Sequence, residues 1–226
     1  MTDGVIYFAN TNHRNRAVDF GIKADDRRRH MYIIGKTGMG KTNLLENLVI
    51  QDIKNGHGVA YIDPHGDTAE KLLQAIPPSR IQDVIYFNPS DQEYPIALNV
   101  MEHVDAKHRH LVASGLIGVF RKLWADSWGP RLEYILRNAI IALMEYPGST
   151  LLGVHRILID KRYREKVTAK VTDPMVRSFW EEEFTMWNER VLQEVISPIQ
   201  TKVGQFLTSP LIRNIVGQTH SSFDVR

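Results

Sequence analysis

Eight consecutive residues near the start of the chain have the types and the spacing that phosphate binding requires. Residues 35–42 read GKTGMGKT and match the pattern G-x-x-x-x-G-K-[ST] at every fixed position. Glycines at this spacing let the backbone turn so that successive N–H groups point into one concavity, where phosphate oxygens replace water. Lys41 is placed to act on the β- and γ-phosphates, and the Thr42 hydroxyl is placed to hold a bridging Mg²⁺ ion. The predicted ATP-binding residues are Gly35, Lys36, Thr37, Gly38, Met39, Gly40, Lys41 and Thr42.

The elements predicted around this loop are those that position a nucleotide. Residues 31–34 read MYII and predict a buried strand, and apolar residues at helical spacing from 44 to 53 predict a helix that ends at Asn55–Gly56. This context favours nucleotide binding over a glycine-rich turn that merely contains a lysine. Further strands are predicted at 5–9, 58–63 and 83–87, with a polar loop at 10–16 and a short apolar segment at 18–22. A helix at 67–76 completes an alternation of strand and helix that predicts a parallel sheet.

Hydrolysis of a bound triphosphate also needs an acid at the end of a neighbouring strand. Asp63 ends the predicted strand 58–63 and is the candidate catalytic acid. Ordinary turn and cap chemistry, with Asp67 capping its own helix, explains the same segment equally well. Asp160 follows a similar apolar run, but the spacing of Leu151, Val154 and Leu158 is helical, so we interpret it as unrelated to the site.

The second half of the chain predicts helices only. Apolar stripes indicate helices near 111–124 and 130–143, at 174–184, and from Asn188 towards Leu207, with Pro198 expected to kink the last of them. The four tryptophans are expected to be core or interface anchors. His103, His108 and His110 are expected to form a solvated helix start rather than a metal site. The arginines at 27–29 are interpreted as a solvated turn.

Composition narrows the class of protein. The chain has 226 residues, no cysteine and a formal charge of +2, so a disulfide framework and a thiolate metal site are excluded and nucleic-acid binding is not indicated by charge. The longest clean apolar run, residues 139–144, is too short to span a bilayer. We therefore expect a cytoplasmic protein.

Several segments together resemble a known family. DDRRRHMYIIGKTGMGKT, GVAYIDPHGD and VIYFNPSD are similar to the ATPase domain of type IV secretion coupling proteins of the TraD/TraG type, and of the related HerA- and FtsK-type DNA pumps. Later segments, such as EYPGSTLLGVHRILID, resemble the helical domain of TraD-like proteins. The resemblance implies a RecA-like parallel core with a large all-α domain, hexameric rings, DNA as partner, and a position peripheral to the inner membrane beside secretion machinery.

Two departures from this family shape the expectation. In the family, the acidic residue that holds the water shell of the magnesium ion and the catalytic glutamate lie on a later apolar strand that ends in Asp-Glu, and no such run occurs here. The membrane-anchoring helices typical of coupling proteins are also missing. We expect an N-terminal fragment with an incomplete α/β core at 1–100, a helical domain at 101–220 and a return to the core at 221–226. Such a chain should bind ATP but hydrolyse it poorly. The alternatives are a nucleotide-gated binding module without turnover and a small-molecule kinase.

Overall fold

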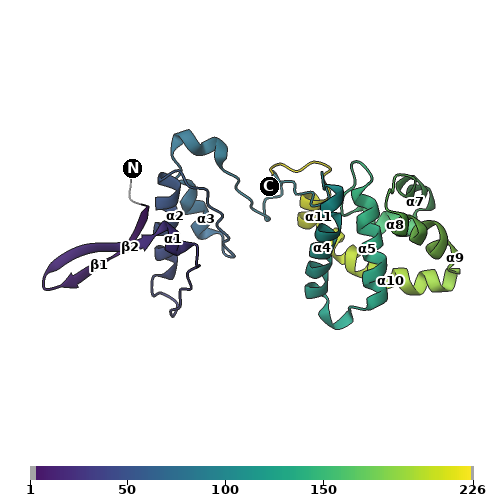
Figure 1. Ribbon diagram of the computed structural model, residues 1–226, viewed down its shortest axis with the longest axis horizontal. Helices are drawn as coiled ribbons and strands as arrows, with labels where there is room; N and C mark the ends of the chain where they lie inside the picture. The colour runs from purple at the N-terminus through teal and green to yellow at the C-terminus, as the bar shows by residue number, and fades with distance from the viewer. Residues whose placement is uncertain (1–3, 225–226) are drawn as a thin grey trace. The chain divides into compact units, whose positions relative to one another are not determined.

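The computed structural model describes residues 4–224, which divide into two compact units between Tyr86 and Phe87 (Figure 1). The predicted domains at 1–100, 101–220 and 221–226 stay a prediction. Val225 and Arg226, which belong to the expected return to the core at 221–226, lie outside the described residues.

The first unit begins with an antiparallel hairpin. Strand β1 (Val5–His13) pairs with β2 (Arg16–Lys23) through a two-residue turn at Arg14 and Asn15, whose φ angles of 54° and 55° match the twist of a hairpin. The polar segment 10–16, expected to be a loop, is therefore mostly strand. A register shift at residues 7–9 marks a β-bulge. Its partner strand carries Gly21 there, where a Cβ atom would lie 2.1 Å from a backbone oxygen of β1.

Helices make up the rest of the first unit. They are α1 (Ala24–Arg27), α2 (Lys41–Lys54), α3 (Asp67–Leu73) and the 3₁₀ helix η1 (Pro78–Asp83). The predicted helix after the phosphate loop is confirmed as α2, which buries Leu48 and Ile53. In Figure 1 the hairpin extends away from these helices, and all its residues from 10 to 20 are exposed.

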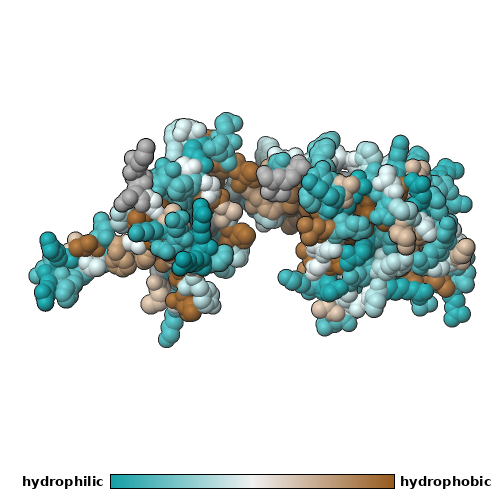
Figure 2. All heavy atoms as spheres, in the orientation of Figure 1, coloured by the Kyte–Doolittle hydropathy of each residue, from teal (hydrophilic) through white to brown (hydrophobic). Residues whose placement is uncertain are grey.

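Three predicted strands are not strands in this structure. Residues 31–34 and 58–63 have no regular secondary structure, and residues 84–87 have none after η1 ends. A strand exists only when a second strand accepts its backbone hydrogen bonds, and within the described residues the hairpin is the whole of the sheet. Several apolar side chains of these segments are exposed, with Tyr32 at 89% and Ile62 at 91%, whereas others such as Ile33 are half-buried. Figure 2 shows hydrophobic residues at the surface of the first unit. The secondary structure is mostly helical, and a parallel RecA-like core is not shown by residues 4–224.

The second unit is helical, as predicted. Its longer helices are α4 (Arg109–Leu123), α5 (Pro130–Met144), α6 (Gly153–Ile159), α7 (Lys161–Thr168), α10 (Glu189–Thr208) and α11 (Pro210–Val216). Shorter pieces are η2 (Ala106–His108), η3 (Ala125–Ser127), α8 (Pro174–Ser178), the π-helical turn Phe179–Glu183 and α9 (Phe184–Met186). Asn188 caps α10 through its side chain, and the helix continues past Pro198.

Helix α5 forms the centre of the second unit. Ten of its residues, among them Ile135, Ala139 and Ile140 at 0% exposure, are buried. Trp180 is buried in the same core, and the other three tryptophans are half-buried and pack against this core. Their expected role as core or interface anchors is therefore confirmed. The apolar residues of this core supply the hydrophobic stabilisation that the first unit largely lacks.

Two segments distant in the sequence lie side by side in the second unit. Leu98 N–H donates to the carbonyl of Ile215 at 3.0 Å, and the backbone of Ala97 exchanges hydrogen bonds with Ser222. Asn99 adds bonds from its side-chain amide to the carbonyls of Ser149 and Thr219. The segment after α11, residues 217–222, is thereby fastened to residues 97–102, and we call it the return segment.

Candidate nucleotide-binding site

The loop at residues 35–42 turns through two glycines in the left-handed conformation and ends at the start of a helix. Gly38 and Gly40 adopt φ angles of 82° and 81°, a left-handed conformation that side-chain-bearing residues rarely accept. Gly40 then caps α2, which begins at Lys41. The first N–H groups of a helix have no partner within it, so the loop ends on backbone donors suited to phosphate oxygens. The predicted loop-to-helix transition is therefore present.

Lys41 lies folded over this loop. Its Nζ donates to the carbonyls of Gly35 and Lys36 at 2.9 and 3.0 Å. These bonds hold the ammonium group above the loop, where a phosphate would replace the carbonyls as its partner. Thr42 follows in the first turn of α2 and is exposed, so its hydroxyl is accessible to a hydrated metal ion. The residues present fit a magnesium nucleotide.

Asp63 has a clear local role, which is to cap α3. Its Oδ2 accepts hydrogen bonds from the N–H groups of Thr68 and Ala69 at 2.9 and 3.2 Å, and its Oδ1 accepts from His65 N–H at 3.0 Å. These backbone donors, that of His65 first, lower the pKa of Asp63. The carboxylate is therefore ionised at neutral pH and keeps lone pairs for a further partner. Cap chemistry was expected here, but from Asp67; in the structure Gly66 occupies the N-cap position and Asp67 is the first residue of α3.

Within the described part of the chain, no hydrogen bond or ion pair joins Asp63 to Lys41, the other residue predicted to be catalytic, or to Thr42. The participation of Asp63 in catalysis thus stays a prediction. Asp160 lies between two helices: it follows α6 and caps α7 by accepting a hydrogen bond from Tyr163 N–H at 3.0 Å. This position agrees with the interpretation that Asp160 does not belong to the nucleotide site.

A buried ion pair anchors the far half of α2. Both oxygens of Asp52, a residue only 6% exposed, accept from the Arg27 guanidinium at 2.7 and 2.5 Å, and His57 Nδ1 lies 3.1 Å from Oδ1. The Arg27 hydrogen bonds are the main cause of a lowered pKa of Asp52. The interpretation of residues 27–29 as a solvated turn is therefore wrong for Arg27, while Arg28 and Arg29 are exposed. Sequence offered no signal for this pairing across 25 positions.

Gln51 anchors the hairpin to the same helix. Its side-chain Nε2 donates to the carbonyl of Tyr7 at 2.6 Å, and its Oε1 accepts from Tyr7 N–H at 3.0 Å. A side-chain amide thus makes the pair of bonds that a neighbouring strand would make, beside the β-bulge. Arg80 closes the other end of α2 by donating to the carbonyls of Ile53 and His57. The helix that carries Lys41 is therefore fixed along its length.

The described helices include none that is both long enough and apolar enough to cross a membrane.

Comparison with curated proteins and comparison with solved structures found no match. The family model "Helicase HerA, central domain" matches residues 10–125, a region that includes the phosphate loop, Asp63 and α4. This match spans just over half of the 226 residues. The chain therefore belongs to the family of the HerA helicase central domain.

Proposed function

We propose that this chain is the ATP-binding part of a DNA-translocating motor ATPase of the HerA family. The observation that carries the proposal is the loop at 35–42, with two left-handed glycines and Lys41 held over it at the start of α2, inside the matched region. The family supports a P-loop nucleoside triphosphatase, and the loop geometry supports phosphate binding.

In this proposal each residue has a limited task. The backbone N–H groups at the start of α2 bind the phosphates, Lys41 exchanges its two carbonyl partners for β- and γ-phosphate oxygens, and the Thr42 hydroxyl holds the hydrated Mg²⁺. Magnesium supplies charge neutralisation between the β- and γ-phosphates. Asp63, besides its role as a cap, would hold the water shell of the magnesium ion near the γ-phosphate.

The finer assignment rests on the sequence resemblance. We propose a conjugative coupling role of the TraD/TraG type, a RecA-like parallel core, DNA as partner, a hexameric ring and a position peripheral to the inner membrane. The three partly exposed apolar segments at 31–34, 58–63 and 84–87 are compatible with such a core, because each has the composition of a buried strand. The proposal also predicts slow ATP hydrolysis by this chain alone.

The test is equilibrium binding of a fluorescent ATP analogue with Mg²⁺. Lys41→Ala should weaken binding by at least about tenfold, because a charge-assisted contact to phosphate is lost. Lys54→Ala, at the other end of α2, removes the same charge and should leave affinity unchanged. Thr42→Val should remove the Mg²⁺ dependence and Thr42→Ser should retain it. Equal binding by the wild type and Lys41→Ala would refute the proposed site.

Hydrolysis separates the motor from the other functions. DNA-stimulated ATP turnover by the assembled protein supports the motor. Nucleotide-dependent hydrogen exchange in the helices of the second unit, without DNA-stimulated turnover, would instead indicate a nucleotide-gated binding module. Transfer of phosphate to a small acceptor would indicate a kinase.

A further inference from the structure

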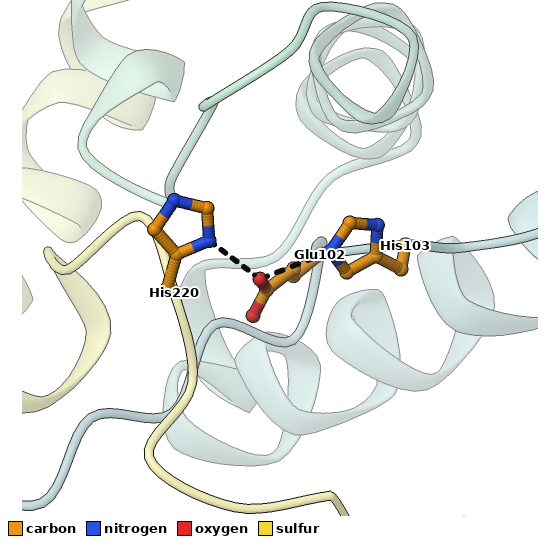
Figure 3. Close-up of side chains that lie close together, drawn as sticks. All are labelled: Glu102, His103 and His220. Carbon is orange, nitrogen blue, oxygen red and sulfur yellow. Dashed lines mark hydrogen bonds and ion pairs between the residues drawn. The ribbon is translucent and has the colours of Figure 1, made fainter.

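A cluster of two histidines and a glutamate lies at the point where the return segment meets the start of the second unit. Glu102 and His103 come from the loop before η2, and His220 comes from the return segment, 118 positions later than Glu102. Figure 3 shows the Glu102 carboxylate between the two imidazole rings. His220 Nδ1 lies 2.8 Å and His103 Nε2 lies 3.3 Å from Glu102 Oε1.

The carboxylate is held so that one oxygen faces the imidazoles. Glu102 Oε2 accepts the backbone N–H of Ser221 at 2.6 Å, which leaves Oε1 directed at His220 and His103. The hydrogen bonds from His220 and then from Ser221 lower the pKa of Glu102 to about 2. The carboxylate is therefore anionic at neutral pH, as a metal ligand must be.

The spacing of the ligand atoms suits a transition-metal ion. One ligand atom from each of the three residues lies within 4.8 Å of the other two. Three ligands about 2.1 Å from a tetrahedral metal are roughly 3.4 Å apart, so the two oxygen–nitrogen separations need little change. Both histidine side chains are largely exposed, at 73% and 81%, and can rotate to close the remaining gap. Exposure also gives a metal ion access.

The donor set determines which ions fit. Two imidazole nitrogens and one carboxylate oxygen suit Zn²⁺ and its neighbours in the first transition row, whereas Mg²⁺ prefers oxygen ligands and retains its water. Three protein ligands leave a fourth position for water. The cluster is thus chemically distinct from the Mg²⁺ site expected at Thr42.

We propose that Glu102, His103 and His220 bind a Zn²⁺-class divalent ion that fastens the return segment to the start of the helical unit. The ion replaces the proton shared between His220 and Glu102 as the link between these segments. His103 contributes a ligand from a left-handed backbone position, with φ at 50°, which directs its side chain from the residue adjacent to Glu102. Because the ligands come from both ends of the second unit, binding stabilises that unit and not the phosphate loop.

The test is titration of the full chain with Zn²⁺, without nucleotide, by calorimetry and by the visible absorption of Co²⁺ as a substitute ion. One equivalent should bind, and the Co²⁺ spectrum should show four- or five-coordination. His220→Asn keeps a donor near Nδ1 for Glu102, and His103→Asn tolerates the left-handed backbone, so both variants should fold. Each should lower the affinity by more than about tenfold, the smallest loss typical of removing an outer-shell partner.

Two other exposed histidines of the second unit provide matched controls. His108→Asn and His110→Asn remove imidazoles outside the cluster and should leave the stoichiometry and affinity unchanged. Zn²⁺ should also raise the unfolding midpoint followed by tryptophan fluorescence, and chelation should reverse the increase. The inference is overturned if no equivalent of Zn²⁺ binds, or if the control variants lose as much affinity as the cluster variants.

Discussion

Replacement of Arg27 by alanine tests whether the Arg27–Asp52 pair stabilises the helix that carries the phosphate loop. The change removes two charge-assisted hydrogen bonds, at 2.7 and 2.5 Å, from a carboxylate that is 6% exposed. Breaking a fully buried pair costs about 3–5 kcal/mol. Arg27 is 29% exposed and His57 remains near Asp52, so water and the imidazole replace part of the loss. We therefore expect about 2 kcal/mol of destabilisation in the first unit, equal to roughly a 30-fold change in an equilibrium constant.

Hydrogen exchange of peptides from α2 is the suitable assay. The four tryptophans, at 124, 128, 180 and 187, all lie in the second unit, so tryptophan fluorescence does not report on the first. Protection of the α2 amides should fall by about 30-fold in Arg27→Ala, while the fluorescence transition stays unchanged. Arg28→Ala and Arg29→Ala alter the same arginine run at exposed positions and should have little effect.

The pH dependence of this effect has a defined sign. The pKa of Asp52 is lowered in the folded state from its ordinary value of 3.8, so its pairing stabilises the protein above that value. The advantage of the wild type over Arg27→Ala should therefore disappear as pH falls below 3.8 and through the lowered pKa. Equal α2 protection in Arg27→Ala, Arg28→Ala and the wild type at neutral pH would refute the reasoning.

Three further outcomes follow from the structure. Gly21→Ala should open the hairpin, because its Cβ would lie 2.1 Å from the backbone of β1, whereas Gly58→Ala meets no atom within 4 Å; hydrogen exchange of β1 compares them. Ile140→Ala, at 0% exposure in α5, should cost about 2–5 kcal/mol in denaturant unfolding followed by tryptophan fluorescence, and Leu111→Ala, at 71% exposure, should change stability by less than about 0.5 kcal/mol. Protonation of Glu102, whose pKa is lowered from 4.5 to about 2, should weaken attachment of the return segment as pH falls from 4.5 through 2. The protection factors of that segment's amides, which correct for the pH dependence of intrinsic exchange, should fall in the wild type, and constant protection factors would contradict the proposed contact.

Local patterns predicted the helices well. A helix can be predicted from a local pattern, because each of its turns makes hydrogen bonds with the turn before it. Helices α2, α4, α5 and α10 all lie where the spacing of apolar residues predicted them. The glycine pattern at 35–42 was likewise visible as eight contiguous residues, and Gly38 and Gly40 adopt left-handed angles there; that the loop binds phosphate stays a prediction. Asp160 was separated correctly from Asp63 on the same periodic evidence, since its apolar neighbours belong to α6.

Long-range pairings were beyond local patterns. The segments at 31–34 and 58–63 have strand composition, but a strand also requires a partner, which sequence periodicity does not specify. The bonds from Arg27 to Asp52 and from His220 to Glu102 join residues 25 and 118 positions apart. His103 was expected to belong to a solvated helix start and not to a metal site, because the sequence does not show that a carboxylate and a second imidazole lie beside it in the fold.

Helix α2 links the nucleotide loop to the hairpin mechanically. Its first residue is Lys41. Gln51 follows ten residues later, about 15 Å along the axis, and makes two hydrogen bonds with the backbone of Tyr7 in β1. The hairpin and the loop at 35–42 are therefore attached to the same helix, and the spacing between Lys41 and Gln51 along its axis sets the distance between the two attachment points.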